Sequence, residues 1–177
     1  MSKLKMATVW LDGCSGCHMS FLDMDERLLE LAELVDVVYS PIVDTKEYPD
    51  GVDIALVEGA VASVDDEKKI KKIREHSRIL VAMGDCAVTA NVPSMRNPIG
   101  PEAVLDRAFI ENATVQPQIP CVVVPKLLKV VKPVHELVKV DVFLPGCPPS
   151  AGTFHTALTA LITGGPLDIP ALTRFGA

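Results

Sequence analysis

Residues 10–18, Trp-Leu-Asp-Gly-Cys-Ser-Gly-Cys-His, join an apolar run to a helical pattern. The run before them, residues 4–11, is apolar on both faces, as strands of a parallel sheet tend to be. After them, apolar residues recur three or four apart over residues 19–34, with acidic residues between, which predicts an amphipathic helix. The turn holds Cys14 and Cys17, so two thiols can face one object. We therefore expect a strand–turn–helix unit that carries a cysteine pair.

The same alternation continues along the 177 residues. Further strands are predicted at 35–40, 52–61, 78–83 and 138–144, and further helices at 64–76, 102–110 and 150–163. The apolar stretch 120–132 is bounded by prolines and receives no assignment. Alternating strands and helices predict an α/β fold in one domain, a mostly parallel sheet with helices on both faces. Residues 166–177 are expected to form a tail.

Composition and charge exclude several classes of protein. Apolar residues make up 49% of the chain and charged residues 23%, so it is not largely disordered. A net charge of −6 argues against a nucleic-acid or anionic membrane surface. No apolar run is long enough to span a membrane, and the N-terminus shows no signal peptide. We expect a cytoplasmic protein, where five cysteines indicate metal or redox chemistry rather than disulfides.

Four of the cysteines follow predicted strands. Cys14 and Cys17 follow the first strand, Cys86 follows the strand at 78–83, and Cys147 follows the last. Parallel strands bring such positions to one edge of a sheet, where open α/β folds bind their ligands. Glycines beside each cysteine leave room for the backbone to curl around a bulky ligand.

Three kinds of site remain open for these thiols. Four thiolates suit a [4Fe–4S] cluster, and on ligand count alone they also suit structural zinc. Zinc sites usually draw on paired short spacings, whereas here one close pair is joined by two isolated cysteines, which favours the cluster. A thioredoxin-like dithiol would use Cys14 and Cys17 but leave Cys86 and Cys147 without a role.

Other polar residues have weaker signals. Cys121 lies in an apolar run and is expected to be a small buried residue. His18 is either a hydrogen-bond donor to a cluster or partner, or a polar residue in the first helical turn. Glu58 is either a residue for proton movement or partner contact, or a carboxylate held by backbone amides. Three histidines are expected on the surface: His76, His135 and His155.

Four motifs, in this order, resemble the small subunits of [NiFe]-hydrogenases and the related complex I subunit. They are Cys14-Ser-Gly-Cys17-His, Glu58-Gly-Ala, Gly84-Asp-Cys86 and Pro145-Gly-Cys147-Pro-Pro-Ser. The complex I relative carries adjacent cysteines at the first position, so Cys14-x-x-Cys17 looks like the hydrogenase side. The run Cys17-His-Met-Ser-Phe-Leu-Asp-Met-Asp-Glu-Arg looks most like the cytoplasmic, bidirectional NAD-reducing branch.

This resemblance implies a flavodoxin-like fold that holds one [4Fe–4S] cluster through Cys14, Cys17, Cys86 and Cys147. It also implies a hydrogenase large subunit with the NiFe centre, and diaphorase subunits carrying further Fe–S clusters, FMN and NAD. The chain itself would carry electron transfer rather than the H₂ site. No phosphate-cradling loop follows the first strand, so FMN is not expected here.

The chain departs from the larger uptake-type small subunits. Those carry a C-terminal extension with ligands for two more clusters, whereas no cysteine follows Cys147 here. We therefore expect one cluster at most and a partner that takes the electron. Two alternatives remain: the small subunit of a membrane hydrogenase or quinone oxidoreductase, and a zinc-stabilised, non-catalytic binding module.

Overall fold

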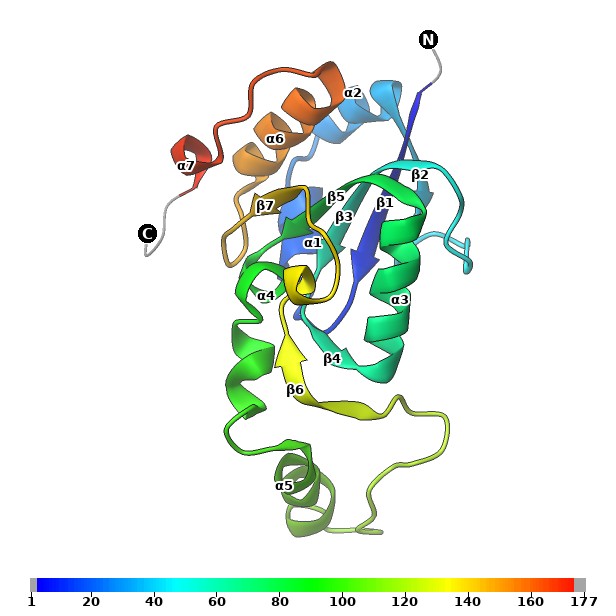
Figure 1. Ribbon diagram of the computed structural model, residues 1–177, viewed down its shortest axis with the longest axis vertical. Coiled ribbons are helices and arrows are strands. Elements are labelled where there is room, and N and C mark those ends of the chain that lie inside the picture. Colours follow the sequence, from blue (N-terminus) through cyan, green and yellow to red (C-terminus); the bar gives the residue numbers. More distant parts are fainter. Residues whose placement is uncertain (1–2, 174–177) are drawn as a thin grey trace.

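The predicted strands form a parallel sheet at the centre of a computed structural model that describes residues 3–173 (Figure 1). Its strand order is β2-β1-β3-β5-β7, and every pairing within it is parallel. The strands are β1 (Leu4–Trp10), β2 (Val35–Tyr39), β3 (Val52–Glu58), β5 (Ser77–Met83) and β7 (Val142–Leu144). This is the doubly wound, flavodoxin-like order, in which the chain changes direction between β1 and β3.

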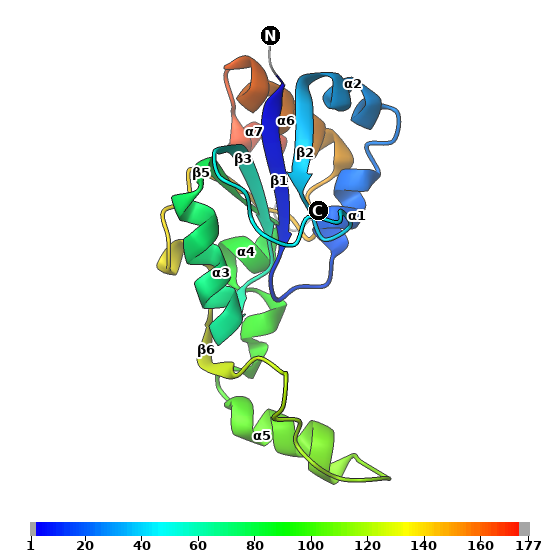
Figure 2. The same cartoon turned by 90° about the vertical axis from the view of Figure 1, so that its right-hand side faces the viewer.

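Helices cover both faces of the sheet (Figure 2). Helices α1 (Gly16–Leu22), α2 (Arg27–Leu34) and α6 (Ala151–Thr163) pack on one face, and α3 (Val64–Glu75) and α4 (Asp85–Thr89) on the other. Successive residues of a strand point to opposite faces, so Ile54 and Leu56 join one core cluster while Ala55 and Val57 join the other. Burial on both sides explains the apolar runs in the central strands, such as residues 54–57 in β3 and residues 80–83 in β5, and the arrangement confirms the predicted fold class.

The helix predicted over 19–34 is two helices, so the prediction of a continuous helix was wrong. Helix α1 begins earlier, at Gly16, and ends at Leu22. A turn follows in which Asp25 takes a left-handed conformation (φ 51°), one that Asp tolerates better than most residues. The turn buries Met24, which is 5% exposed, before α2 begins.

Two predicted strands are shorter than expected. The strand at 52–61 ends at Glu58, because Gly59 (φ +91°) turns the chain against Asp12, and residues 61–63 form the separate strand β4 (Val61–Ser63). The strand at 138–144 is reduced to β7, since the Asp141 side chain, rather than a backbone carbonyl, accepts the Leu80 N–H at 2.9 Å.

Residues 97–126 extend from the body as an arm (Figure 2). The predicted helix at 102–110 is α5 (Pro101–Asp106), continued by the π-helical turn η2 (Arg107–Glu111). The unassigned stretch contains β6 (Leu127–Lys132), which pairs with β4 in a two-stranded antiparallel sheet. Short 3₁₀ turns, η1 (Val92–Arg96) and η3 (Val134–Glu136), flank these elements.

Serine side chains cap two of the helices. Ser63 and Asp66 form a reciprocal capping box at the start of α3, and Ser150 accepts the Thr153 N–H at the start of α6. Within the expected tail, α7 (Ile169–Leu172) returns to α6, where Thr153 donates to the Leu172 carbonyl. Residues 174–177 lie outside the described part of the chain.

Candidate functional site

The four cysteines singled out from the sequence lie at the carboxyl edge of the sheet. Cys14 and Cys17 follow β1, with Cys17 in the first turn of α1; Cys86 is in α4 after β5, and Cys147 follows β7. The charges of the other three cysteines contribute to raising the pKa of Cys17, so Cys17 lies within electrostatic reach of each of them. The edge placement expected from the strand pattern is therefore present in the fold.

Gly84 is the point where the cysteine-bearing loops meet. It has φ +81°, and a Cβ added there would collide with the Cys17 Sγ. The Gly146 carbonyl oxygen lies 3.5 Å from the same position. Only glycine fits both the backbone conformation and the space. The Cys17 thiol is thereby brought against the loops that carry Cys86 and Cys147.

Burial disfavours ionisation of the two inner thiols in the absence of a metal. Burial raises the pKa of Cys17 most, and the charge of Glu58 and the other cysteines raise it further. Burial also raises the pKa of Cys86, while a hydrogen bond from the Val92 N–H opposes that rise. Cys14 and Cys147 are exposed, so one side of the edge is open to a partner.

N–H groups point at three of the four sulfurs. The Gly16 N–H donates to Cys14 Sγ over 3.4 Å, Asn91 Nδ2 donates to Cys147 Sγ over 3.9 Å, and the Val92 N–H donates to Cys86. Such donors stabilise anionic sulfur and set the potential of iron–sulfur centres. Four thiols around a glycine cradle, three of them with N–H donors, are thus a donor set that fits an iron–sulfur cluster.

His18 and Glu58 tie the first cysteine loop to the end of β3. Glu58 is 1% exposed, and its Oε2 accepts the His18 backbone N–H at 3.1 Å and also contacts His18 Nδ1. His18 Nε2 is buried, with no hydrogen-bond partner among the described residues. The expectation of a strand-end Glu held by a backbone amide is met, and the imidazole adds a second contact to the same oxygen.

The remaining candidates lie elsewhere. Cys121 is exposed on the arm, so the prediction of a buried residue was wrong; it lines a largely apolar cavity of about 510 Å³ with Phe109 and Val124. The run around it packs on no core, because the arm leaves the body of the protein (Figure 2). His76 pairs with Asp50, and His135 makes an edge-to-face contact with Phe143.

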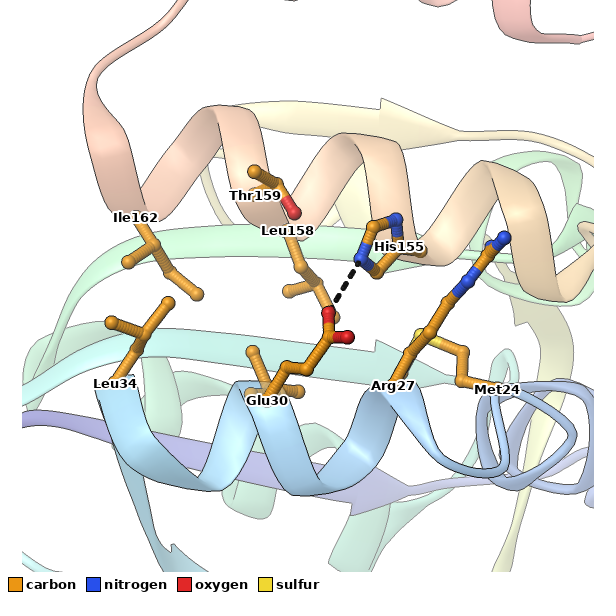
Figure 3. A pocket seen from close by; sticks show the side chains of 9 residues that line it. Met24, Arg27, Glu30, Leu34, His155, Leu158, Thr159 and Ile162 are labelled. Carbon is orange, nitrogen blue, oxygen red and sulfur yellow. Dashed lines mark ion pairs between the residues drawn. The ribbon is translucent and has the colours of Figure 1, made fainter.

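A groove of about 220 Å³ lies between α2 and α6 (Figure 3). His155 faces it from α6, with Nε2 3.9 Å from Glu30 Oε2 on α2, while Leu34, Leu158 and Ile162 form its apolar end. None of its lining residues is a cysteine.

The described side chains do not form a site for a single metal ion. Within residues 3–173, no three His, Cys, Asp or Glu side chains lie close enough together to hold a single metal ion. A four-iron cluster needs a different arrangement of ligands, because its own volume keeps its four thiolates apart.

No helix in the described range has both the length and the apolar character needed to cross a membrane.

Comparison with known proteins assigns the chain to a family. The sequence profile described as NADH ubiquinone oxidoreductase, 20 Kd subunit, matches residues 14–161. The chain belongs to this family. The matched range of this 20 Kd subunit family member includes all four cysteines at the sheet edge, from Cys14 to Cys147. The relationship to the complex I subunit expected from the motifs is confirmed.

Curated hydrogenase subunits are among the relatives. The chain is 41% identical over 174 residues to the NAD-reducing hydrogenase HoxS subunit delta of Cupriavidus necator, a match that covers 96% of this chain and 83% of that subunit. It is 38% identical over 169 residues to a vhu subunit of the F420-non-reducing hydrogenase of Methanocaldococcus jannaschii, covering 94% of this chain and 59% of that protein. The chain thus spans most of the first relative and little more than half of the second.

Solved structures of hydrogenases also match this chain. A chain in the crystal structure of an NAD⁺-reducing [NiFe]-hydrogenase in the H₂-reduced state matches with a TM-score of 0.92 and 41% identity, covering 98% of this chain and 99% of that chain. A chain of the Dm. baculatum [NiFeSe]-hydrogenase matches with a TM-score of 0.62 and 20% identity, covering 92% of this chain and 63% of that chain, which shows the fold alone. The predicted hydrogenase resemblance is therefore confirmed.

Proposed function

We propose that this chain holds one [4Fe–4S] cluster through Cys14, Cys17, Cys86 and Cys147 and carries electrons for a cytoplasmic, NAD-reducing [NiFe]-hydrogenase. The cluster would stand between the nickel–iron site of a large subunit and diaphorase subunits that carry FMN and further Fe–S clusters and reduce NAD. The observation that carries the proposal is the gathering of four thiols from three strand ends at one edge. The 41% identity to a subunit of an NAD-reducing hydrogenase supports the choice of partners.

The arrangement of the thiols favours a cluster over the two alternative sites. A dithiol would use only Cys14 and Cys17, yet Cys86 and Cys147 lie at the same edge and influence the pKa of Cys17. A zinc knuckle brings paired ligands onto a single ion. Here three loops face one another across a glycine cradle, which suits a ligand with volume of its own.

The residues of this chain would bind the cluster and set its reduction potential, and they take no part in bond making. When bound, the cluster supplies one-electron redox chemistry. The four thiolates hold it, the Gly16, Asn91 and Val92 N–H groups stabilise sulfur charge, and the α6 N-terminus after Cys147 adds a favourable dipole. Burial of Cys17 and its surroundings keeps water away from the inner side of the site.

The decisive experiment compares five Cys→Ser variants, purified anaerobically through a tag on this chain. Spectra are recorded on the partial complex with the large subunit, which lacks the Fe–S clusters of the diaphorase, and H₂-driven NAD reduction is measured on the complete complex. We expect Cys14→Ser, Cys17→Ser, Cys86→Ser and Cys147→Ser each to abolish or convert the four-iron electron paramagnetic resonance (EPR) signal and block H₂-driven NAD reduction. Cys121→Ser is the matched control and should change neither. A normal four-iron signal in any of the first four variants would contradict the ligand assignment.

The same preparation tests the rival functions. A zinc-stabilised binding module would be colourless and contain zinc, whereas a [4Fe–4S] protein is brown and contains iron. Co-purification with a flavoprotein supports the diaphorase, and co-purification with membrane subunits would favour a membrane hydrogenase or quinone oxidoreductase.

A further inference from the structure

Asp85 joins the two loops that carry the isolated cysteines. Its side-chain Oδ1 accepts the Gly146 N–H at 2.7 Å, and its own backbone N–H donates to the Gly146 carbonyl at 2.9 Å. Asp85 directly precedes Cys86, and Gly146 directly precedes Cys147. One residue thus makes a two-way contact between the immediate neighbours of two thiols that lie 61 residues apart.

These contacts begin where the sheet ladder stops. Strands β5 and β7 are in register from Val81 to Met83, and the Gly84 N–H still donates to the Leu144 carbonyl at 2.8 Å. Beyond that point Gly146 has φ +143° and the loops diverge from strand geometry. The Asp85 carboxylate then takes the place of a backbone acceptor and continues the pairing up to the cysteines.

The far side of the Cys147 loop is also fixed. Ser20 on α1 donates to the Pro149 carbonyl at 2.6 Å, and this contact is buried. Gly146 fits closely under the following prolines, since a Cβ there would lie 2.6 Å from the Pro149 nitrogen. With these two restraints in place, the Asp85–Gly146 contact is what sets the position of Cys147 relative to Cys86.

We propose that Asp85 is a positioning residue that fixes the separation of the Cys86 and Cys147 thiols by accepting the Gly146 N–H. The inference rests on the proposed function, because the separation matters only if both thiols hold one cluster. What the role requires is an acceptor oxygen at the right distance from the backbone, and the negative charge of Asp85 is not needed. Asn keeps an oxygen at the same distance from the backbone, Glu keeps the charge but moves the oxygen outward, and Ala removes the oxygen.

The test measures how firmly the cluster is held. The partial complex of this chain with the large subunit, which lacks the diaphorase clusters, is prepared with Asp85→Asn, Asp85→Glu and Asp85→Ala, and loss of iron to a ferrous chelator is followed anaerobically by visible absorbance. We expect the rate of iron loss to rise about 10–100-fold in Asp85→Ala and Asp85→Glu, the range usual for lost outer contacts of a metal site. Asp85→Asn should lose iron at nearly the wild-type rate, and its EPR spectrum should retain the four-iron signal.

Asp141→Ala is the matched control. Asp141 also accepts a backbone N–H across the β5–β7 pair, that of Leu80, but at the opposite end of the strands from the cysteines. It should weaken the strand pair without changing the rate of iron loss. If Asp85→Ala fails to assemble, the comparison of Asn with Glu decides the matter alone.

The outcomes separate this inference from the proposed function. Fast loss in Asp85→Asn with slow loss in Asp85→Glu would show that charge matters and overturn the positioning role. Equal rates in Asp85→Ala and Asp141→Ala would also overturn it, while leaving the proposed function intact. A four-iron signal that persists in Cys86→Ser and Cys147→Ser would overturn both.

Discussion

Gly84 is the residue at which steric space limits the site most sharply. Changing Gly84 to Ala places a Cβ on the Cys17 Sγ and forces a side chain into φ +81°. We expect the partial complex of this variant with the large subunit to contain little four-iron cluster, because Cys17 must move away from the loops of Cys86 and Cys147. Iron and acid-labile sulfide per chain, with the EPR signal of the reduced complex, measure the loss.

Gly51 supplies the control for backbone strain. It has φ +67°, close to that of Gly84, but a Cβ there would have nothing within 4 Å. Gly51→Ala therefore carries only the left-handed strain, about 1–2 kcal/mol, and should retain its iron. Equal iron content in the two variants would show that contact with Cys17 does not matter.

Asn91 offers a way to change the potential of the proposed cluster without substituting any of the four cysteines. Its Nδ2 donates to Cys147 Sγ over 3.9 Å, and a donor to sulfur favours the more negative, reduced state. Asn91→Asp replaces the donor by a carboxylate, so we expect the reduction potential to become more negative. Asn91→Ala should shift it in the same direction by a smaller amount. Redox titration followed by EPR checks both, and an unchanged potential in Asn91→Asp would remove Asn91 from the site.

At the scale of elements, the sequence predicts what depends on strand direction and periodicity. The cysteines could be placed because carboxyl ends of parallel strands share an edge. The break in helix 19–34 at Asp25 and the end of β3 at Gly59 were not predictable from periodicity. The break is a local turn with a left-handed residue that buries Met24, and β3 ends where Gly59 lies closely against Asp12. Periodicity also does not predict the Asp85–Gly146 and Asn91–Cys147 contacts, whose partners are 61 and 56 residues apart.

The end of the β5–β7 pair opposite the cysteines depends on Asp141. This carboxylate accepts the Leu80 N–H at 2.9 Å and pairs with Arg74. Asp141→Ala leaves the Leu80 N–H without its acceptor, while Arg74 keeps the carbonyls of Ser77 and Arg78. We therefore expect local opening of this strand pair to become easier by about 1–3 kcal/mol. Amide hydrogen exchange of residues 77–83 and 142–144 in the complex measures it. Asp36→Ala, which breaks the more exposed pair with Lys3, should have a much smaller effect.

The pH dependence of this effect has a definite sign. Burial opposes ionisation of Asp141, but the Leu80 N–H, Arg74 and Lys139 outweigh it and hold its pKa below the ordinary value. A lowered pKa gives stabilisation that is complete above the unfolded pKa, about 3.9, and is lost only as the pH falls through the folded pKa. The difference between wild type and Asp141→Ala in the free energy of local opening, obtained from amide exchange, should therefore be constant from about pH 8 to 5. A difference that shrank over this range would contradict the assignment.

The fold places the proposed redox site at one edge of the sheet, and a long arm, residues 97–126, extends from the body with exposed apolar residues. In the arm, Val122 is 78% exposed and Val123 is 99% exposed, and Val123 has the left-handed φ of 63° that a β-branched residue rarely adopts. Cys14 and Cys147 are exposed at the thiol edge itself. A chain with these surfaces is suited to act within a larger assembly, and we expect it to be poorly soluble alone.

The place of this chain in the electron path can be tested with a partial complex. If the chain only carries electrons, a preparation of this chain with the large subunit should be reduced by H₂, bleaching the visible absorption of the cluster. Adding NAD⁺ should not restore the colour, because neither the flavin nor the NAD site is expected on these two subunits. Adding the diaphorase together with NAD⁺ should restore it. Recovery with NAD⁺ alone would place the acceptor site on these two chains, and recovery with a quinone but not with the diaphorase would favour the membrane-linked alternative.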